Sequence, residues 1–319
     1  VSAHMDLTQK LYPALDKLIS EIEKKAESVQ GITKTGRTHL MDAMPVDFSD
    51  ELKAWSSQLT ASRKMLGVIE DRFLEMPQGG TAVGSGINAH KQFAKIFAKE
   101  LTKLSGSNCK CVASSNFFHE LSAQDCSVQL SGELKNLAVI LMKISNDLRW
   151  MNSGPLAGLS EIELQALQPG SSIMPGKVNP VIPEAVTMVS ADVIGNDVSI
   201  TVAAQAGNFQ LNVMLPVIAY NLLKSINLLS GAMEVLSNKA IKTFKVNKKS
   251  LEASLSRNPI LVTALNPIIG YEKAAEIAKK AYKLGKPIIE VANEETDLTE
   301  IQLKKLLNPS KLTKGGISK

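Results

Sequence analysis

The chain has 319 residues, of which 44% are hydrophobic and only 4% aromatic, and its formal net charge is +5. This is enough apolar material for a large core in one or two domains. The lysines are scattered rather than gathered into a basic stripe interleaved with aromatic residues, which argues against a nucleic-acid-binding protein.

The composition is rich in Leu, Ala, Ile, Lys and Glu, which favours helices over sheets. Apolar residues recur at helical spacing over long segments, and no run alternates as a strand would. The predicted helices span residues 5–30, 47–75, 91–104, 118–150, 181–206 and 213–242. The helix over 118–150 is the longest and needs neighbours of similar length, so a helix bundle is implied.

Proline and glycine divide the rest of the chain. Pro13 is expected to kink the first helix, residues 31–45 to form a loop, and residues 79–88 to form a glycine-rich connection. After residue 245 the sequence becomes lysine-rich, and four prolines separate short helices. We therefore predict a central long-helix domain over residues 1–245 and a small C-terminal domain over residues 246–319.

One segment is apolar enough to require a membrane test. The run from Val198 to Leu223 carries no charged residue and is long enough to span a bilayer. Its glutamine and asparagine residues would be costly in lipid, whereas a helix that is apolar on most faces can be buried in a large core. We expect a core helix that is interrupted near Gly207 and resumes near Val213, with no membrane association.

Cysteine usage and the start of the chain bear on the compartment. Cys109, Cys111 and Cys126 are an odd number in a long chain, which favours a reducing compartment. Cys109 and Cys111 with His119 do not match the usual zinc spacings, so no metal and no other cofactor is expected. No signal peptide is visible, and Val1 already stands in a helical pattern, as in a fragment or a processed chain. We expect a cytoplasmic protein, or a mitochondrial matrix protein if the source is eukaryotic.

The most distinctive stretch is GSSIMPGKVNP, residues 170–180. Glycine and proline make it a loop, Asn179 suits the N-cap of the following helix, and Pro180 suits its first position. Free backbone N–H groups and Lys177 would then lie together at a helix N-terminus. Such a site suits a carboxylate, or the extra charge that a carboxylate gains when its neighbouring carbon loses a proton. On these residues alone, an ordinary polar loop before a capped helix explains the pattern equally well.

Two further residues have an ordinary explanation beside a functional one. His39 follows Thr38 in a glycine-containing loop, and a single histidine there is most often structural or simply exposed. Glu184 lies near the start of the helix after Pro180, where the helix dipole favours a carboxylate whatever its function.

The literal motifs change this balance. GSSIMPGKVNP resembles the signature loop of the fumarase/aspartase superfamily, and GRTHLMDAMP (36–45) resembles its second signature region. GGTAVGSGIN (79–88) resembles a structural turn of the same superfamily, and the likeness continues through MKISNDLRWMNSGP (142–155) and NPILVTALNP (258–267). The resemblance covers nearly the whole chain in register.

The resemblance implies an all-α fold of the class II fumarase type. A long-helix bundle domain would form the core of a homotetramer whose active sites are shared between three subunits, and a small helical C-terminal domain would follow. The implied reaction is the reversible hydration of fumarate to malate, a step of the tricarboxylic acid cycle, through an aci-carboxylate and without a cofactor.

The resemblance also implies the role of each site residue. Ser171 would take a proton from the carbon beside a carboxylate, and Lys177 and Asn179 would hold that carboxylate as it becomes an aci-carboxylate. Thr38 would bind a carboxylate oxygen. His39 would belong to the acid or water side, with Glu184 as its charged partner.

Two alternatives stay open at this stage. NPVIPEAV and VIGND are nearer to aspartate ammonia-lyases, although Leu215 stands where those enzymes usually have a glutamate.

The family's third signature, rich in Ser and Asn, is absent from these residues, so the chain would supply two of the three parts of each site. A separate partner or a longer chain would supply the rest, or the protein would be an inactive helical scaffold.

Overall fold

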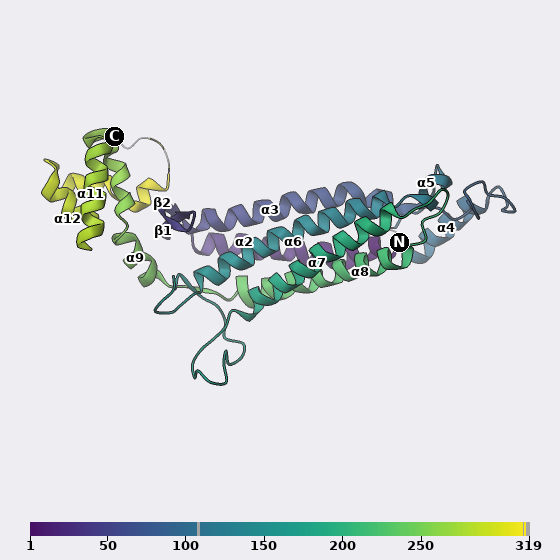
Figure 1. The fold of residues 1–319 in the computed structure, drawn as a ribbon, viewed down its shortest axis with the longest axis horizontal. Coiled ribbons are helices and arrows are strands. Elements are labelled where there is room, and N and C mark those ends of the chain that lie inside the picture. The colour runs from purple at the N-terminus through teal and green to yellow at the C-terminus, as the bar shows by residue number, and fades with distance from the viewer. Residues whose placement is uncertain (107–108, 315, 317–319) are drawn as a thin grey trace. The chain divides into compact units, whose positions relative to one another are not determined.

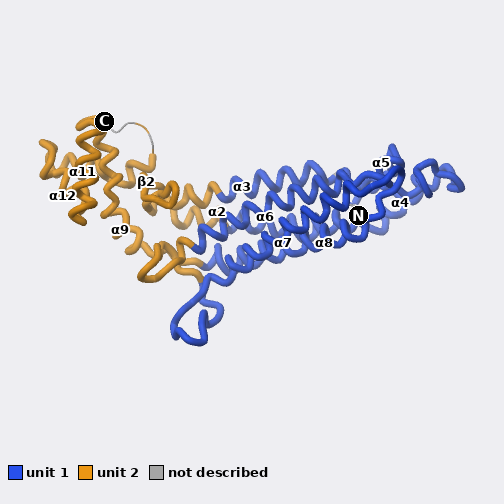
Figure 2. Tube along the Cα trace, in the orientation of Figure 1, with its two compact units in different colours: residues 1–21, 55–149, 165–243 blue, residues 22–54, 150–164, 244–319 orange. Residues whose placement is uncertain are grey.

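The computed structural model describes residues 1–106, 109–314 and 316, and it divides into two compact units. The bundle unit comprises residues 1–21, 55–149 and 165–243, and the hairpin unit comprises residues 22–54, 150–164 and 244–319 (Figure 2).

The bundle unit is built from long helices that run alongside one another (Figure 1). The helices that contribute to it, in chain order, are α1 (Ser2–Asp6), α2 (Tyr12–Ser28), α3 (Phe48–Ile69), α4 (Phe93–Ser105), α5 (Phe117–Ser122), α6 (Asp125–Met151), α7 (Val181–Gln205) and α8 (Leu215–Leu236). The end of α2, the start of α3 and the end of α6 belong to the hairpin unit. The fold is thus mainly helical, which confirms the predicted class.

The apolar stripe of α6 shows why these helices form a bundle. Its leucine and isoleucine side chains at helical spacing are completely buried: Leu130, Leu134, Leu137, Leu141, Ile144 and Leu148. Each such side chain contributes about 1.5–3 kcal/mol when it leaves water. The stripe therefore fixes which face of α6 turns inward.

Several predicted helix boundaries need correction. The helix expected over 118–150 is broken, because Asn116 caps α5 and the backbone is extended at Ala123 before α6 begins. The kink expected at Pro13 is replaced by a π-helical turn, Leu7–Leu11, directly before α2. A proline lacks an N–H and crowds the carbonyl four residues earlier, and the wider turn accommodates both. Helix α3 continues as a 3-10 turn, Glu70–Leu74, and α8 as a second π turn, Ser237–Ile241.

The break predicted near Gly207 is present. Helix α7 ends at Gln205 and α8 begins at Leu215. Asn212 is 1% exposed, and its Nδ2 donates to the carbonyls of Ala203 (3.1 Å) and Ala204 (3.0 Å), which satisfies the end of α7.

Helix α7 is also the one described helix that is long and apolar enough to cross a membrane by length and composition. It carries two carboxylates in ion pairs: Asp197 with Lys135 (2.6 Å) and Asp192 with Lys224 (2.9 Å). Such groups are costly in lipid, so they favour the interpretation of α7 as a helix of the protein core.

No run of the sequence alternates as a strand would, yet short strands occur in three two-stranded pairs among the described residues. The pairs are β1 (Thr33–Thr38) with β2 (Met41–Asp47), β3 (Glu75–Met76) with β4 (Val112–Ala113), and β5 (Ile162–Glu163) with β6 (Lys245–Val246). The segment 31–45, expected to be a loop, is therefore mostly an antiparallel hairpin.

The glycine-rich connection over residues 79–88 is a compact turn, as expected. The N–H groups of Gly84 and Gly86 both bond to the carbonyl of Gly80, at 2.9 and 3.0 Å. A Cβ on Gly80 would lie 2.7 Å from Phe117 Cβ, so glycine is required where this turn packs on α5.

The hairpin unit contains the hairpin β1–β2 and the short C-terminal helices. These are α9 (Lys248–Ser256), a 3-10 turn (Pro259–Leu265), α10 (Asn266–Ile269), α11 (Tyr271–Leu284), α12 (Ile288–Glu295), α13 (Glu300–Leu306) and α14 (Pro309–Leu312). Buried side chains between Leu255 and Leu307 form a hydrophobic cluster of their own. In space, residues 22–54 and 150–164 group with the C-terminal segment. The predicted division into domains at residue 245 therefore stays a prediction.

Candidate active site

The signature loop of the bundle unit is closed on itself by two hydrogen bonds. Gly170 N–H donates to the Lys177 carbonyl (2.8 Å), and Asn179 Nδ2 donates to the Gly170 carbonyl (2.9 Å). A Cβ on Gly170 would lie 2.6 Å from the Lys177 oxygen, so only glycine permits this closure. The loop therefore presents the residues between Gly170 and Lys177 as one compact turn.

The hydroxyl of Ser171 is held inside this turn. Its Oγ accepts hydrogen bonds from the backbone N–H groups of Ile173 (3.1 Å) and Met174 (3.2 Å). Ser171 is half-buried, whereas Ser172 is exposed. Two fixed N–H donors on one oxygen stabilise negative charge there, so they lower the free energy of a serine alkoxide. A serine becomes a useful base only when its alkoxide is stabilised in this way.

Lys177 lies at the other side of the same turn. Its side chain is exposed, and within the described part of the chain no carboxylate lies at ion-pair distance from its ammonium. Lys177 and Ser171 both line a cavity of about 470 Å³ whose walls come from residues 166–178. The cavity thus combines a cation with a hydroxyl and can accept a small carboxylate.

The expected N-cap role of Asn179 is wrong. Helix α7 starts at Val181, its N-cap is Pro180, and no side chain caps it. The Asn179 amide instead bridges to Gly170, nine residues earlier. Its Nδ2 carries a second N–H, which can be donated to a ligand. Glu184 lies in the first turn of α7, near the start of the helix as predicted, and is half-buried.

Thr38 and His39 lie at the tip of the β1–β2 hairpin in the hairpin unit. Thr38 pairs with Met41, and the two turn residues His39 and Leu40 have φ of 54° and 61°. These are left-handed conformations that favour glycine, and each costs a side-chain-bearing residue roughly 1 kcal/mol or more. Thr38, His39, Leu40 and Met41 are all exposed. The hairpin therefore holds this strained tip exposed to solvent.

The structure thus brings the predicted residues together in two sets. Ser171, Lys177 and Asn179 share one loop, followed by Glu184 on the next helix, in the bundle unit. Thr38 and His39 share one hairpin tip in the hairpin unit.

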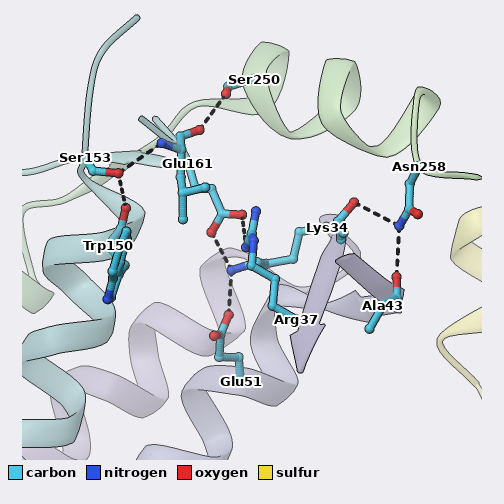
Figure 3. A network of polar contacts seen from close by, with 11 residues as sticks. Lys34, Arg37, Ala43, Glu51, Trp150, Ser153, Glu161, Ser250 and Asn258 are labelled. Carbon is cyan, nitrogen blue, oxygen red and sulfur yellow. Dashed lines mark hydrogen bonds and ion pairs between the residues drawn. The ribbon is translucent and has the colours of Figure 1, made fainter. Parts of the chain in front are cut away.

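A buried ion network holds the base of the hairpin, and sequence reasoning missed it (Figure 3). Lys34 Nζ on β1 donates to Glu161 Oε2 (2.6 Å) and to Glu51 Oε2 (2.8 Å), and Arg37 donates to Glu161 Oε1 (2.7 Å). The side chains of Lys34 and Glu161 are each 3% exposed. Removing either partner of such a buried pair is strongly destabilising.

An asparagine fixes the other side of the hairpin. Asn258 is 1% exposed, and its Nδ2 donates to the Ala43 carbonyl (2.9 Å) and to Thr35 Oγ1 (3.4 Å) (Figure 3). Its Oδ1 accepts from Ile260 N–H (2.9 Å). Asn258, the first residue of NPILVTALNP, therefore holds the hairpin in place. The sequence indicated only that an asparagine before a proline can cap a helix.

Among the described residues, no group of three or more His, Cys, Asp or Glu side chains is placed to hold a metal ion. Ser171 and Lys177 line the cavity of the signature loop, so the groups that the loop offers there are a stabilised serine hydroxyl and a lysine ammonium.

Comparisons with known proteins identify the family of the chain. A family model described as "Lyase" matches residues 1–195, and a model described as "Fumarase C C-terminus" matches residues 261–314. Fumarate hydratase class II 2 of Pseudomonas aeruginosa is 57% identical over 317 residues, which cover 99% of this chain and 69% of the relative. Fumarate hydratase class II of Bacillus subtilis is 45% identical over 98% of this chain and 68% of the relative.

A solved structure shows the same fold. The crystal structure of a class II fumarase from Schistosoma mansoni superposes with a TM-score of 0.92 at 33% identity, over 98% of this chain and 68% of that chain. The chain thus spans about two thirds of the length of these relatives. Its 45–57% identity to the two named fumarate hydratases, over 98–99% of its length, shows that the chain belongs to the class II fumarate hydratase family of lyases.

Proposed function

We propose that the protein catalyses the reversible hydration of fumarate to malate and that Ser171 is the base. The observation that carries the assignment is the pair of backbone N–H groups donating to Ser171 Oγ. In the direction of dehydration, the Ser171 alkoxide takes a proton from the malate carbon beside a carboxylate. The electron pair of the broken C–H bond moves into that carboxylate, which becomes a dianionic aci-carboxylate.

Lys177 and Asn179 receive the developing charge. The exposed Lys177 ammonium faces the same cavity as Ser171, and the second N–H of the Asn179 amide is available for a carboxylate oxygen. Donors that are already in place when charge develops lower the barrier more than they strengthen binding of the ground state. Collapse of the dianion then forms the double bond and expels the neighbouring hydroxyl.

The expelled hydroxyl needs a proton, and we assign this side of the reaction to His39, with Glu184 as its charged partner. Thr38 would bind a carboxylate oxygen of the same substrate. Support comes from the exposed hairpin tip, whose left-handed turn holds both side chains outward. Strain of this kind is commonly retained where function requires the conformation.

The protein is expected to be oligomeric like its family, and we propose a homotetramer whose active sites combine residues of different subunits. Helices α7 and α8 pack on each other, yet they leave large apolar side chains more than half exposed: Met188, Val198, Val202 and Tyr220. An exposed apolar surface of this kind is typical of a subunit interface. We also propose a cytoplasmic location.

The reaction is tested by the loss of fumarate ultraviolet absorption on adding protein, with malate as the product. Faster formation of aspartate from fumarate and ammonia than of malate from fumarate and water would overturn the proposed reaction.

Shared sites are tested by mixing two inactive variants, Ser171→Ala and His39→Asn, under mild denaturant and then reassembling them. If one subunit supplies Ser171 and another His39, some hybrid sites are intact and activity returns. Mixtures that stay as inactive as the separate variants would contradict the sharing of sites. Sedimentation in dilute solution provides the independent check, since a folded monomer would contradict the tetramer.

A further inference from the structure

Two buried thiols stand side by side in the bundle unit. The Sγ atoms of Cys109 and Cys111 lie 3.6 Å apart, and the residues are 2% and 7% exposed. The backbone explains the pairing, because Cys111 N–H donates to the Cys109 carbonyl (3.0 Å) and forms a γ-turn around Lys110. A turn of this type brings the two Cα atoms into the range that a disulfide requires.

The turn is fixed to its neighbours. Thr102 on α4 accepts the Cys111 N–H at its Oγ1 (2.9 Å) and donates to the Ala98 carbonyl (2.9 Å). After the turn, β4 pairs with β3. The thiols are therefore held next to each other by the fold, with their Sγ atoms 3.6 Å apart, whereas the S–S bond of a disulfide measures about 2.05 Å.

Within the described part of the chain, Cys111 borders a cavity and Cys109 is not among the residues that line it. Cys111 contributes to the wall of a space of about 660 Å³, and four lysines line the same space: Lys95, Lys99, Lys103 and Lys110. Among the described contacts, Lys103 pairs with Glu100 (2.6 Å), which leaves a strongly cationic lining beside a largely apolar wall. A cavity of this size and charge suits a small anionic molecule.

We propose that Cys109 and Cys111 are a dithiol modification site, oxidised to an intramolecular disulfide by an anionic peptide disulfide of the glutathione type that docks in the lysine-lined cavity. Cys111, after losing its proton to solvent, attacks one sulfur of the oxidant. The S–S bond of the oxidant breaks, and its first thiol leaves with a proton. Cys109 loses its proton and attacks Cys111 Sγ, which expels the second thiol. The two cysteines lose two electrons and two protons, and the oxidant becomes two thiols.

Docking matters because the Cys111 thiol is not reactive by itself. Burial raises the pKa of the Cys111 thiol, and its hydrogen bond with Cys109 acts in the same direction, so little thiolate is present at neutral pH. An oxidant held in the cavity compensates through its high local concentration. Cys126, whose burial raises its pKa to about 11, is not among the residues that line this cavity and stays reduced.

Trypsin provides a direct assay, because it cleaves after Lys103, Lys110 and Lys135. Peptide 104–110 contains Cys109, and peptide 111–135 contains both Cys111 and Cys126, which the Cys126→Ser variant tells apart. After incubation of the protein with glutathione disulfide and blocking of residual thiols, the proposal predicts that these two peptides stay joined through Cys109 and Cys111. Cys126→Ser should leave this product unchanged, and Cys109→Ser should stop at a glutathione adduct on Cys111. Full alkylation of Cys109 and Cys111, or an adduct on Cys126 instead, would overturn the dithiol site.

The cavity is tested by charge. The double variant Lys95→Glu/Lys99→Glu should slow oxidation by glutathione disulfide by about tenfold and leave oxidation by neutral bis(2-hydroxyethyl) disulfide unchanged. The matched control is Lys64→Glu, an exposed lysine of the bundle unit that does not line the cavity. Equal rates with glutathione disulfide in the double variant and the control would overturn docking of an anionic oxidant.

Discussion

The variant Glu161→Gln tests whether the buried ion network holds the hairpin that carries Thr38 and His39. Glutamine keeps the shape of the side chain but removes the charge that faces Lys34 at 2.6 Å and Arg37 at 2.7 Å. Removing one partner of a buried ion pair costs about 3–5 kcal/mol. Lys34 keeps its second partner, Glu51, at 2.8 Å, so we expect a loss of stability near 3 kcal/mol, at the lower end of that range.

Chemical denaturation measures this loss, and Glu163→Gln is the matched control. Glu163 is exposed, lies two residues away on β5, and should change stability by less than about 0.5 kcal/mol. A second readout is trypsin cleavage after Arg37, which should become faster in the variant because Arg37 loses its carboxylate partner. Indistinguishable stability and cleavage in the two variants would refute the argument that Glu161 fixes the hairpin.

Other predictions follow from single contacts. Gly36→Ala should destabilise the hairpin by about 1–3 kcal/mol in thermal unfolding, because its Cβ would lie 2.6 Å from a carbonyl oxygen of the opposite strand. Hydrogen bonds from Lys280 and Lys273 lower the pKa of Glu295 to about 2. The ionised Glu295 therefore stabilises the folded state at every pH above the pKa of the unfolded chain, and this contribution is lost as the pH falls through about 2. A carboxyl titration by NMR with a midpoint near 4 would contradict this. Lys177→Met should reduce both turnover and dicarboxylate affinity by at least about tenfold, and unchanged affinity would exclude it as a carboxylate ligand.

The long helices were predictable because their information is local. The leucine stripe of α6 repeats every three or four residues, and burial of that stripe follows from the repeat alone. The glycine-rich turn was predictable for the same reason. The loop at Ser171 could be located from glycine and proline, and its literal sequence carried the family resemblance.

The hairpin could not be predicted, because its stability comes from residues far away in the sequence. A sequence pattern places a lysine such as Lys34 on the surface. In the structure its ammonium is buried and donates a hydrogen bond to Glu161, 127 residues later. Asn179 likewise has the composition of a helix cap, and only the closure onto Gly170 shows its actual partner. The grouping of residues 22–54 and 150–164 with the C-terminal segment depends on such contacts too.

The central claim is that Ser171, held by the N–H groups of Ile173 and Met174, is the base. The most direct measurement compares turnover of malate and affinity for an unreactive dicarboxylate in Ser171→Ala and Ser172→Ala. Because a positioned base contributes about 10²–10⁴-fold, Ser171→Ala should lower turnover by that factor and leave inhibitor affinity nearly unchanged. The exposed Ser172 should tolerate alanine. A severe defect in Ser172→Ala with a mild one in Ser171→Ala would contradict the account.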